Sequence, residues 1–208
     1  MTLLIIGILL VLASFGIARG TGNVKNFAGI LRKIGIAVIV GGIFSACIMQ
    51  IDAGQIGVKK LFGQVQRDVL SSGLHFINPL LEIEKLDVKT QNYTMSGQHD
   101  EGLKSGDDAI RVLTADGLEV TIDLSVLYRV ITNDAPMLLQ ETGTDYEDKI
   151  VRPITRTRIR DNAVYYDAVA LYSTKRDEFQ LRIFKTIETD FKKRGLLLEN
   201  LLVRNKIG

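Results

Sequence analysis

The sequence is poor in the residues from which reactive sites are built, with one cysteine, two histidines and no tryptophan among 208 residues. The single cysteine, Cys47, lies inside an apolar run, so the remainder of the chain can form neither a disulfide nor a thiolate metal site. Gly-x-Ser-x-Gly, His-Glu-x-x-His and phosphate-loop motifs are absent too. We therefore expect a protein that is not an enzyme, with no catalytic residues, no cofactor and no metal site.

An excess of one charge is also missing, because 26 basic residues stand against 24 acidic ones. Proteins that bind nucleic acid rely on a strong positive field from clustered lysines and arginines. The even balance therefore predicts that the protein does not bind nucleic acid.

The two histidines have different surroundings. We expect His75, in the segment GLHF, to tie a turn to the neighbouring backbone. His99 lies close to Asp100, Glu101, Asp107 and Asp108, so a weak cation site is conceivable. The spacing matches neither an EF-hand nor a zinc site, and we favour a solvated loop.

The sequence contains two long apolar runs. Residues 3–18 read LLIIGILLVLASFGIA and residues 34–51 read IGIAVIVGGIFSACIMQI. At ~1.5 Å per helical residue the second run matches the ~30 Å hydrocarbon core of a bilayer, whereas the first is marginal. The sequence therefore predicts a membrane anchor over residues 1–52, with the lipid bilayer as a partner.

The anchor matches neither of two processing signals well. The start of the chain lacks the basic residues of a cleaved signal peptide. The segment ending at Cys47 resembles a loose lipoprotein signal, but another apolar run precedes it and the run continues past the cysteine. We favour an unmodified Cys47.

The segment that connects the two runs predicts the topology. It carries Arg19, Lys25, Arg32 and Lys33 and no acidic residue, and positively charged loops stay in the cytoplasm. A hairpin of two spanning helices, or a single span, then places the domain that follows on the outer side. A re-entrant hairpin would instead place it in the cytoplasm.

Strands dominate the first half of that domain, residues 53–208. Residues 118–131 alternate between apolar and polar side chains, and residues 110–115 form a second strand candidate. Asp116 and Gly117 between them predict a two-residue hairpin turn, because both residues tolerate the positive φ that such turns require. Residues 55–62 and 86–90 also have the character of strands.

Helical signals dominate after Thr132. Asp134 is expected to cap a short helix that ends at Gly143, and Thr144 to Glu147 forms a capping-box pattern for a longer one with a kink at Pro153. A last helix should start near Ser173 and stop at Gly195, before a closing strand. It should bury Phe179, Ile183, Ile187 and Phe191. Strands, then helices, then one strand indicate an α+β domain.

Basic residues recur at helical spacing within the longer helix. Arg152, Arg156 and Arg160 are four residues apart, so they form one positive stripe. The stripe is either a solvated face or an assembly contact with acidic residues of a neighbouring protomer.

The domain resembles the SPFH (band 7) family of stomatins, prohibitins and flotillins, and its spacing is most similar to bacterial prohibitin-like members. The resemblance spans residues 53–205 and rests on the segments IGV and LFG, SGLHFINP, the Asp116-Gly117 hairpin and residues 146–154. We expect the matching residues Ile56, Val58, Phe62, His75, Phe76 and Pro79 to be fold determinants. The family's usual C-terminal coiled coil is missing from the chain, which ends at Gly208.

The resemblance implies a non-catalytic membrane scaffold that forms large ring or cage oligomers with itself or with related subunits. It also implies regulation of partner membrane proteins such as FtsH-type AAA+ proteases, in a bacterial inner membrane with the domain on the periplasmic side. A monomeric lipid- or ligand-binding module and a subunit of a membrane protease are the alternatives.

Overall fold

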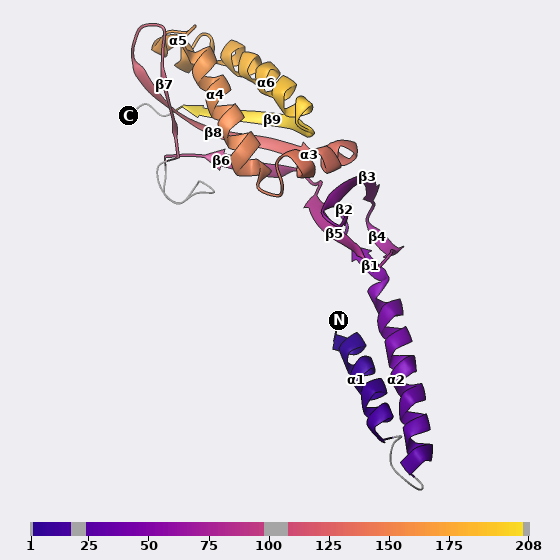
Figure 1. Cartoon of the computed structure of the whole chain (residues 1–208). Helices are drawn as coiled ribbons and strands as arrows, with labels where there is room; N and C mark the ends of the chain where they lie inside the picture. The colour runs from indigo at the N-terminus through magenta and orange to yellow at the C-terminus, as the bar shows by residue number, and fades with distance from the viewer. Residues whose placement is uncertain (1, 18–23, 98–107, 206–208) are drawn as a thin grey trace.

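The computed structural model describes residues 2–17, 24–97 and 108–205. A helical hairpin leads into a small β module, which leads into a larger module of strands and helices (Figure 1). We call residues 48–87 the proximal module and the described residues from 91 onward the distal module. One core joins the two, because Ile56, Val58 and Leu86 pack in the same cluster as the distal residues. The fold is α+β, as the sequence predicts.

The hairpin consists of α1 (Thr2–Ile17) and α2 (Val24–Ala46). Their backbones approach closely at two glycines. A Cβ on Gly7 would lie 2.6 Å from the side chain of Ile39, and one on Gly35 would lie 2.8 Å from that of Val11. Small residues permit such contact between apolar helices, so α1 and α2 form one tightly packed unit.

The second apolar run is not a single helix, which corrects its predicted extent. Helix α2 begins at Val24 and ends at Ala46, while residues 48–51 form the strand β1 (Ile48–Ile51). The chain leaves the helix there because β1 pairs with β4 (Gly73–Phe76), which satisfies its backbone in a two-stranded ribbon. Arg32 and Lys33 consequently lie on α2 and not in a loop.

The proximal module adds a three-stranded antiparallel sheet to that ribbon. Its order is β3 (Gln64–Leu70), β2 (Gln55–Leu61) and β5 (Leu81–Asp87). The predicted strand at 55–62 is confirmed. The one predicted at 86–90 is wrong, because β5 ends at Asp87 and β6 (Gln91–Met95) starts in the distal sheet.

The distal sheet is built around β8 (Glu119–Val130), which pairs with β6, β7 (Ile110–Leu113) and β9 (Leu196–Asn205). The predicted β7–β8 hairpin is confirmed, but its turn is wider than two residues and only Gly117 has positive φ. Asp116 accepts hydrogen bonds from the Thr114 hydroxyl and the Ala168 amide. Both bonds lower the pKa of Asp116, and the bond from Thr114 has the larger effect. Together they hold the wider turn.

Helices cover one face of the distal sheet (Figure 1). After a 3₁₀ turn (Thr132–Asp134) they are α3 (Ala135–Glu141), a π-helical turn (Glu147–Val151), α4 (Arg152–Ala163), α5 (Ala168–Tyr172) and α6 (Arg176–Lys193). The four predicted apolar residues of α6 are all buried. No side-chain cap forms at Asp134 or at the start of the π-helical turn, so both predicted caps are wrong. Pro153 is the second residue of α4, so the residue predicted to kink the helix lies where the π-helical turn passes into α4.

Candidate functional site

The proximal module exposes large apolar side chains where it meets α2. Phe62 is 87% exposed, Leu74 72% and Phe76 68%. Ile48 and Leu80 are exposed beside them, and we call these five residues the apolar end. The Phe76 ring lies 5.6 Å from that of Phe44 in the last turns of α2. The apolar end is therefore continuous with the apolar surface of the hairpin.

Local hydrogen bonds shape the apolar end. His75 Nε2 donates to the Ser71 carbonyl oxygen at 2.7 Å, which confirms the interpretation of His75 as a residue that ties a turn to the backbone. Asn78 Oδ1 accepts from the Leu80 amide at 3.0 Å. At the β2–β3 turn Phe62 adopts a positive φ of 49°, which side chains rarely take without support. These turns hold the apolar side chains toward solvent.

The family-like residues fall into two groups. Ile56 and Val58 are buried in the core, as expected of fold determinants. Phe62, Phe76 and Pro79 are exposed, so they contribute little to packing within one chain. Their exposure fits a surface that contacts something else, and their role stays a prediction. Leu74 and Leu80 were missed, although Leu74 alternates with Phe76 along the sequence.

The arginine stripe is held within its own chain. Arg152 and Arg156 both donate to the carboxylate of Asp108, which is 5% exposed, and Arg156 also donates to the Asp108 carbonyl oxygen at 2.8 Å. The hydrogen bond that Arg152 donates to Asp108 raises the pKa of Arg152. Arg160 Nε reaches the Arg111 carbonyl oxygen at 3.4 Å. The stripe thus fastens α4 to the region of β7, and its role in assembly stays a prediction.

A second polar group lies between the π-helical turn and the distal sheet. The Tyr128 hydroxyl lies 2.8 Å from Glu147 Oε1, and the Tyr146 hydroxyl lies 3.0 Å from Gln91 Oε1. Burial is the main cause that raises the pKa of both tyrosines; the bond to Glu147 adds to this shift for Tyr128, whereas the bond to Gln91 opposes it for Tyr146. Burial also raises the pKa of Tyr93, which lies near Asp108. Tyr128 and Tyr146 therefore act as neutral hydrogen-bonding groups of the core.

Within the residues that the structure describes, no group of three or more His, Cys, Asp or Glu side chains could hold a metal ion. His99 and its acidic neighbours up to Asp107 lie outside the described residues. The described histidine, His75, has the Ser71 carbonyl oxygen as its partner.

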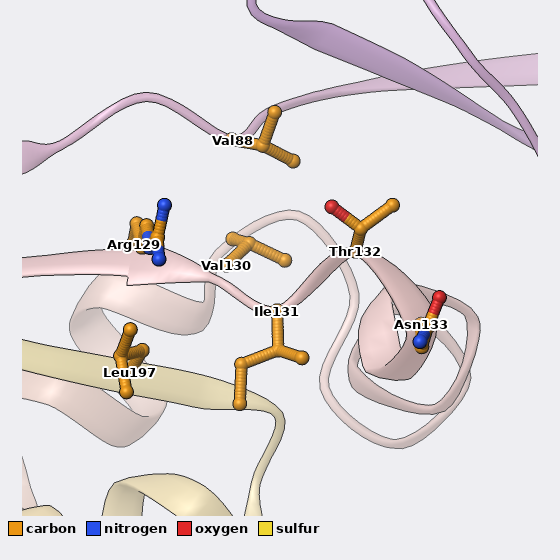
Figure 2. A pocket seen from close by; sticks show the side chains of 7 residues that line it. All are labelled: Val88, Arg129, Val130, Ile131, Thr132, Asn133 and Leu197. Carbon is orange, nitrogen blue, oxygen red and sulfur yellow. The ribbon is translucent and has the colours of Figure 1, made fainter.

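A cavity of about 470 Å³ lies at the elbow between the two modules. Val88, in the β5–β6 connection, lies across it from Arg129, Val130 and Thr132 (Figure 2). Arg129 also pairs with Glu199 on β9, with 3.2 Å between Nε and Oε1. The cavity thus lies at the elbow and not between the distal sheet and its helices, and its lining combines apolar side chains with Arg129, Thr132 and Asn133.

Comparison with known proteins gives one family. The family described as "SPFH domain / Band 7 family" matches residues 49–206, which include both modules and leave out the hairpin. Among curated proteins, the mitochondrial prohibitin complex protein 1 of Caenorhabditis elegans is 23% identical over 185 residues, which cover 87% of this chain and 62% of that protein.

Two further relatives show similar identity and coverage. Prohibitin 1 of Gallus gallus is 25% identical over 82% of this chain and 59% of its own length. Prohibitin-1 of Saccharomyces cerevisiae is 25% identical over 87% of this chain and 59% of its own length. The chain thus spans about six tenths of the length of the relatives that it matches.

Proposed function

Because the chain belongs to the SPFH domain / Band 7 family, we propose that it is a non-catalytic, membrane-anchored scaffold of the prohibitin type. The observation that carries the proposal is the continuous apolar surface formed by the hairpin and the apolar end. Of the described helices one, over Ala28–Ala46, is long and apolar enough to cross a membrane. Exposed apolar areas of this size are stable in lipid and not in water.

In this arrangement the hairpin inserts into the bilayer and the apolar end rests on the membrane surface. Leu74 and Phe76 belong to a ribbon whose outer edges carry unpaired backbone groups. Such edges need water, so the ribbon fits the headgroup region while its apolar side chains point toward the acyl chains. The distal module then stands away from the membrane, where it can contact neighbouring copies.

Lateral assembly into large rings or cages is the second part of the proposal. A modest contact between anchored copies becomes durable when many of them share a membrane plane. One relative is named as a protein of the mitochondrial prohibitin complex, which supports assembly here. Control of a partner such as an FtsH-type AAA+ protease, and a periplasmic domain in a bacterial inner membrane, complete the proposal.

Native mass of the full chain, extracted in mild detergent, tests the assembly. We expect particles of many copies, because a scaffold acts through its size. A discrete monomer would contradict the proposal. The charge reversal Arg160→Glu is the matched variant, because Arg160 makes only a long bond to a backbone carbonyl of its own chain. Smaller particles in this variant would support an assembly role for the stripe.

The absence of tryptophan allows a direct test of the apolar end. Phe76→Trp places a single fluorophore at the apolar end, and Tyr165→Trp places one at an exposed site, 64% accessible, after α4 in the distal module. In vesicles that contain phospholipids brominated along the acyl chains, we expect quenching of the first and none of the second. Equal quenching of the two tryptophan variants would contradict the proposed orientation.

The elbow cavity supports a second candidate, a monomeric module that binds a small ligand. The volume of about 470 Å³ suits a small molecule, and Arg129 would attract an anionic group. This candidate predicts a monomer in detergent and an affinity that falls on Arg129→Gln. The native mass therefore separates the two functions.

A further inference from the structure

Residues 28–46 are long enough to cross a membrane, but the part of α2 that carries no charge is short. In α2 the uncharged stretch after Arg32 and Lys33 is residues 34–46, which is about 20 Å long at ~1.5 Å per residue. Helix α1 has 16 residues and is about 24 Å long. An ordinary bilayer has a hydrocarbon core about 30 Å thick. The charge-free length therefore falls short of that core.

The end of the hairpin next to the proximal module cannot slide deeper into the bilayer. Helix α2 closes at Ala46, where the Cys47 amide donates to the Ile43 carbonyl at 3.1 Å. Strand β1 follows at once and, among the described strands, pairs with β4 alone. Open strand edges are not stable within hydrocarbon. The ribbon therefore marks one boundary of the hydrocarbon.

Arg32 and Lys33 mark the other boundary of the hydrocarbon. Arg32 and Lys33 are both exposed on α2, and the Arg32 guanidinium lies 5.3 Å from the centre of the Phe15 ring, near the end of α1. Positive charges are strongly disfavoured inside hydrocarbon. Their long side chains can reach toward the far surface, which reduces the mismatch. Both arms thus end near the level of Arg32.

The hairpin also cannot lengthen by changing its own shape. The close approach at Gly7 and Gly35 packs the two arms as one unit. Tilting accommodates helices that are too long and makes short ones shorter still across the membrane. The bilayer is therefore the part that has to adapt.

We propose that the hairpin fits a thin bilayer, so its preferred lipid partners are phospholipids with short acyl chains. A bilayer of ordinary thickness is thinned around it. This inference rests on the proposed membrane anchoring. It adds a selectivity that anchoring alone does not require, because a scaffold of many such hairpins gathers, or creates, a thin patch of membrane.

Reconstitution of the full chain tests the inference. The protein is mixed from detergent into vesicles of phosphatidylcholines whose monounsaturated chains lengthen stepwise from fourteen to twenty-two carbons. The measured quantity is the fraction that floats with the vesicles after a urea wash. We expect the fraction to be highest in the shortest lipids and to fall by roughly tenfold toward the longest, since mismatch is penalised per ångström.

Two variants sharpen the test. The double substitution Arg32→Leu with Lys33→Leu extends the charge-free stretch of α2 to residues 26–46, about 30 Å, and should move the optimum to longer chains. Arg32→Lys retains the charge and should leave the optimum in place. Equal flotation of the unmodified chain at every length, or an unmoved optimum in the double variant, would overturn the inference and leave the anchoring intact. No flotation at any length would overturn both.

Discussion

The proximal and distal modules use apolar side chains in opposite ways. In the distal module Phe179 and Phe191, on the inner face of α6, are at most 1% exposed, whereas Leu181 on the same helix is 56% exposed. In the proximal module Phe62 and Phe76 are mostly exposed. The difference shows that the buried face of α6 serves the stability of the distal module, whereas the proximal module leaves large apolar side chains at its surface, where the proposed function places the membrane.

Polar side chains show the same division. The distal module buries a carboxylate, Asp108, between two arginines and connects tyrosines through Gln91 and Glu147. The ion pairs of the proximal module lie nearer the surface, for example Lys59 with Asp68, whose carboxylate is 85% exposed. Exposed pairs contribute little to stability. The distal module is therefore expected to determine the free energy of unfolding.

The largest expected effect comes from removing one aromatic ring from each module. Phe191→Ala leaves a cavity at a fully buried site and should cost about 3–5 kcal/mol. Phe76→Ala removes an exposed ring and should change stability by about 0.5 kcal/mol or less. Chemical unfolding in detergent measures both. Similar losses for the two variants would remove the distinction between the modules.

The next effect concerns the buried carboxylate. Asp108→Asn leaves Arg152 and Arg156 without their charged partner. We expect a loss of about 2–3 kcal/mol, reduced from that of a fully buried pair because the two arginine side chains are 31% and 22% exposed. Asp145→Asn is the control, since Asp145 is 72% exposed and pairs with Lys149 at 3.5 Å. A loss in the control equal to that of Asp108→Asn would refute this ranking.

A smaller effect is expected within the proximal module. A Cβ on Gly57 would lie 2.7 Å from Ile83 and 2.9 Å from Ile51, so this glycine lets the ribbon pack on the β2–β5 sheet. Gly57→Val should cost about 1–3 kcal/mol through overpacking. Hydrogen exchange should rise in β1 and β4 and stay unchanged in β8 and β9. The control is Gly41→Ala, because a Cβ there would meet open space and the backbone has no positive φ. Gly63→Ala would also meet open space, but its positive φ of 85° would strain any side chain.

The smallest effect at neutral pH concerns the buried tyrosines. Burial raises the pKa of Tyr93, Tyr128 and Tyr146 above the usual 10.0. The unfolded chain therefore releases these protons first, so stability is complete below pH ~10 and falls as the pH rises above it. The slope is about 1.4 kcal/mol per pH unit for each tyrosine. Tyr146→Phe should reduce this slope by one tyrosine's share. An unchanged slope between about pH 10 and 11.5 would contradict the assignment.

Periodicity in the sequence predicted the distal module well. The alternation in β8 and the four-residue spacing in α6 identified the buried residues of both elements, because one face of each meets the core. Strand β9 was predicted as well. The proximal module was predicted poorly, since β1, β3 and β4 are short or partly exposed and so lack a regular apolar pattern.

The surface that carries the proposed function was predicted only in part. Phe62 and Phe76 were selected from the family-like segments, but their exposure could not be known, because apolar residues are ordinarily buried. The partner of the arginine stripe was also not predictable. Asp108 lies 44 residues before Arg152, and such a distant pair depends on how α4 packs on the sheet.

The sequence by itself determined that the chain has an apolar anchor, an α+β domain and few reactive side chains, because composition and periodicity are local properties. Only the tertiary structure decided where α2 ends, which arginines are occupied within the chain and which apolar residues face outward. Each of these depends on contacts between segments far apart in the sequence, such as β1 with β4 and α4 with Asp108.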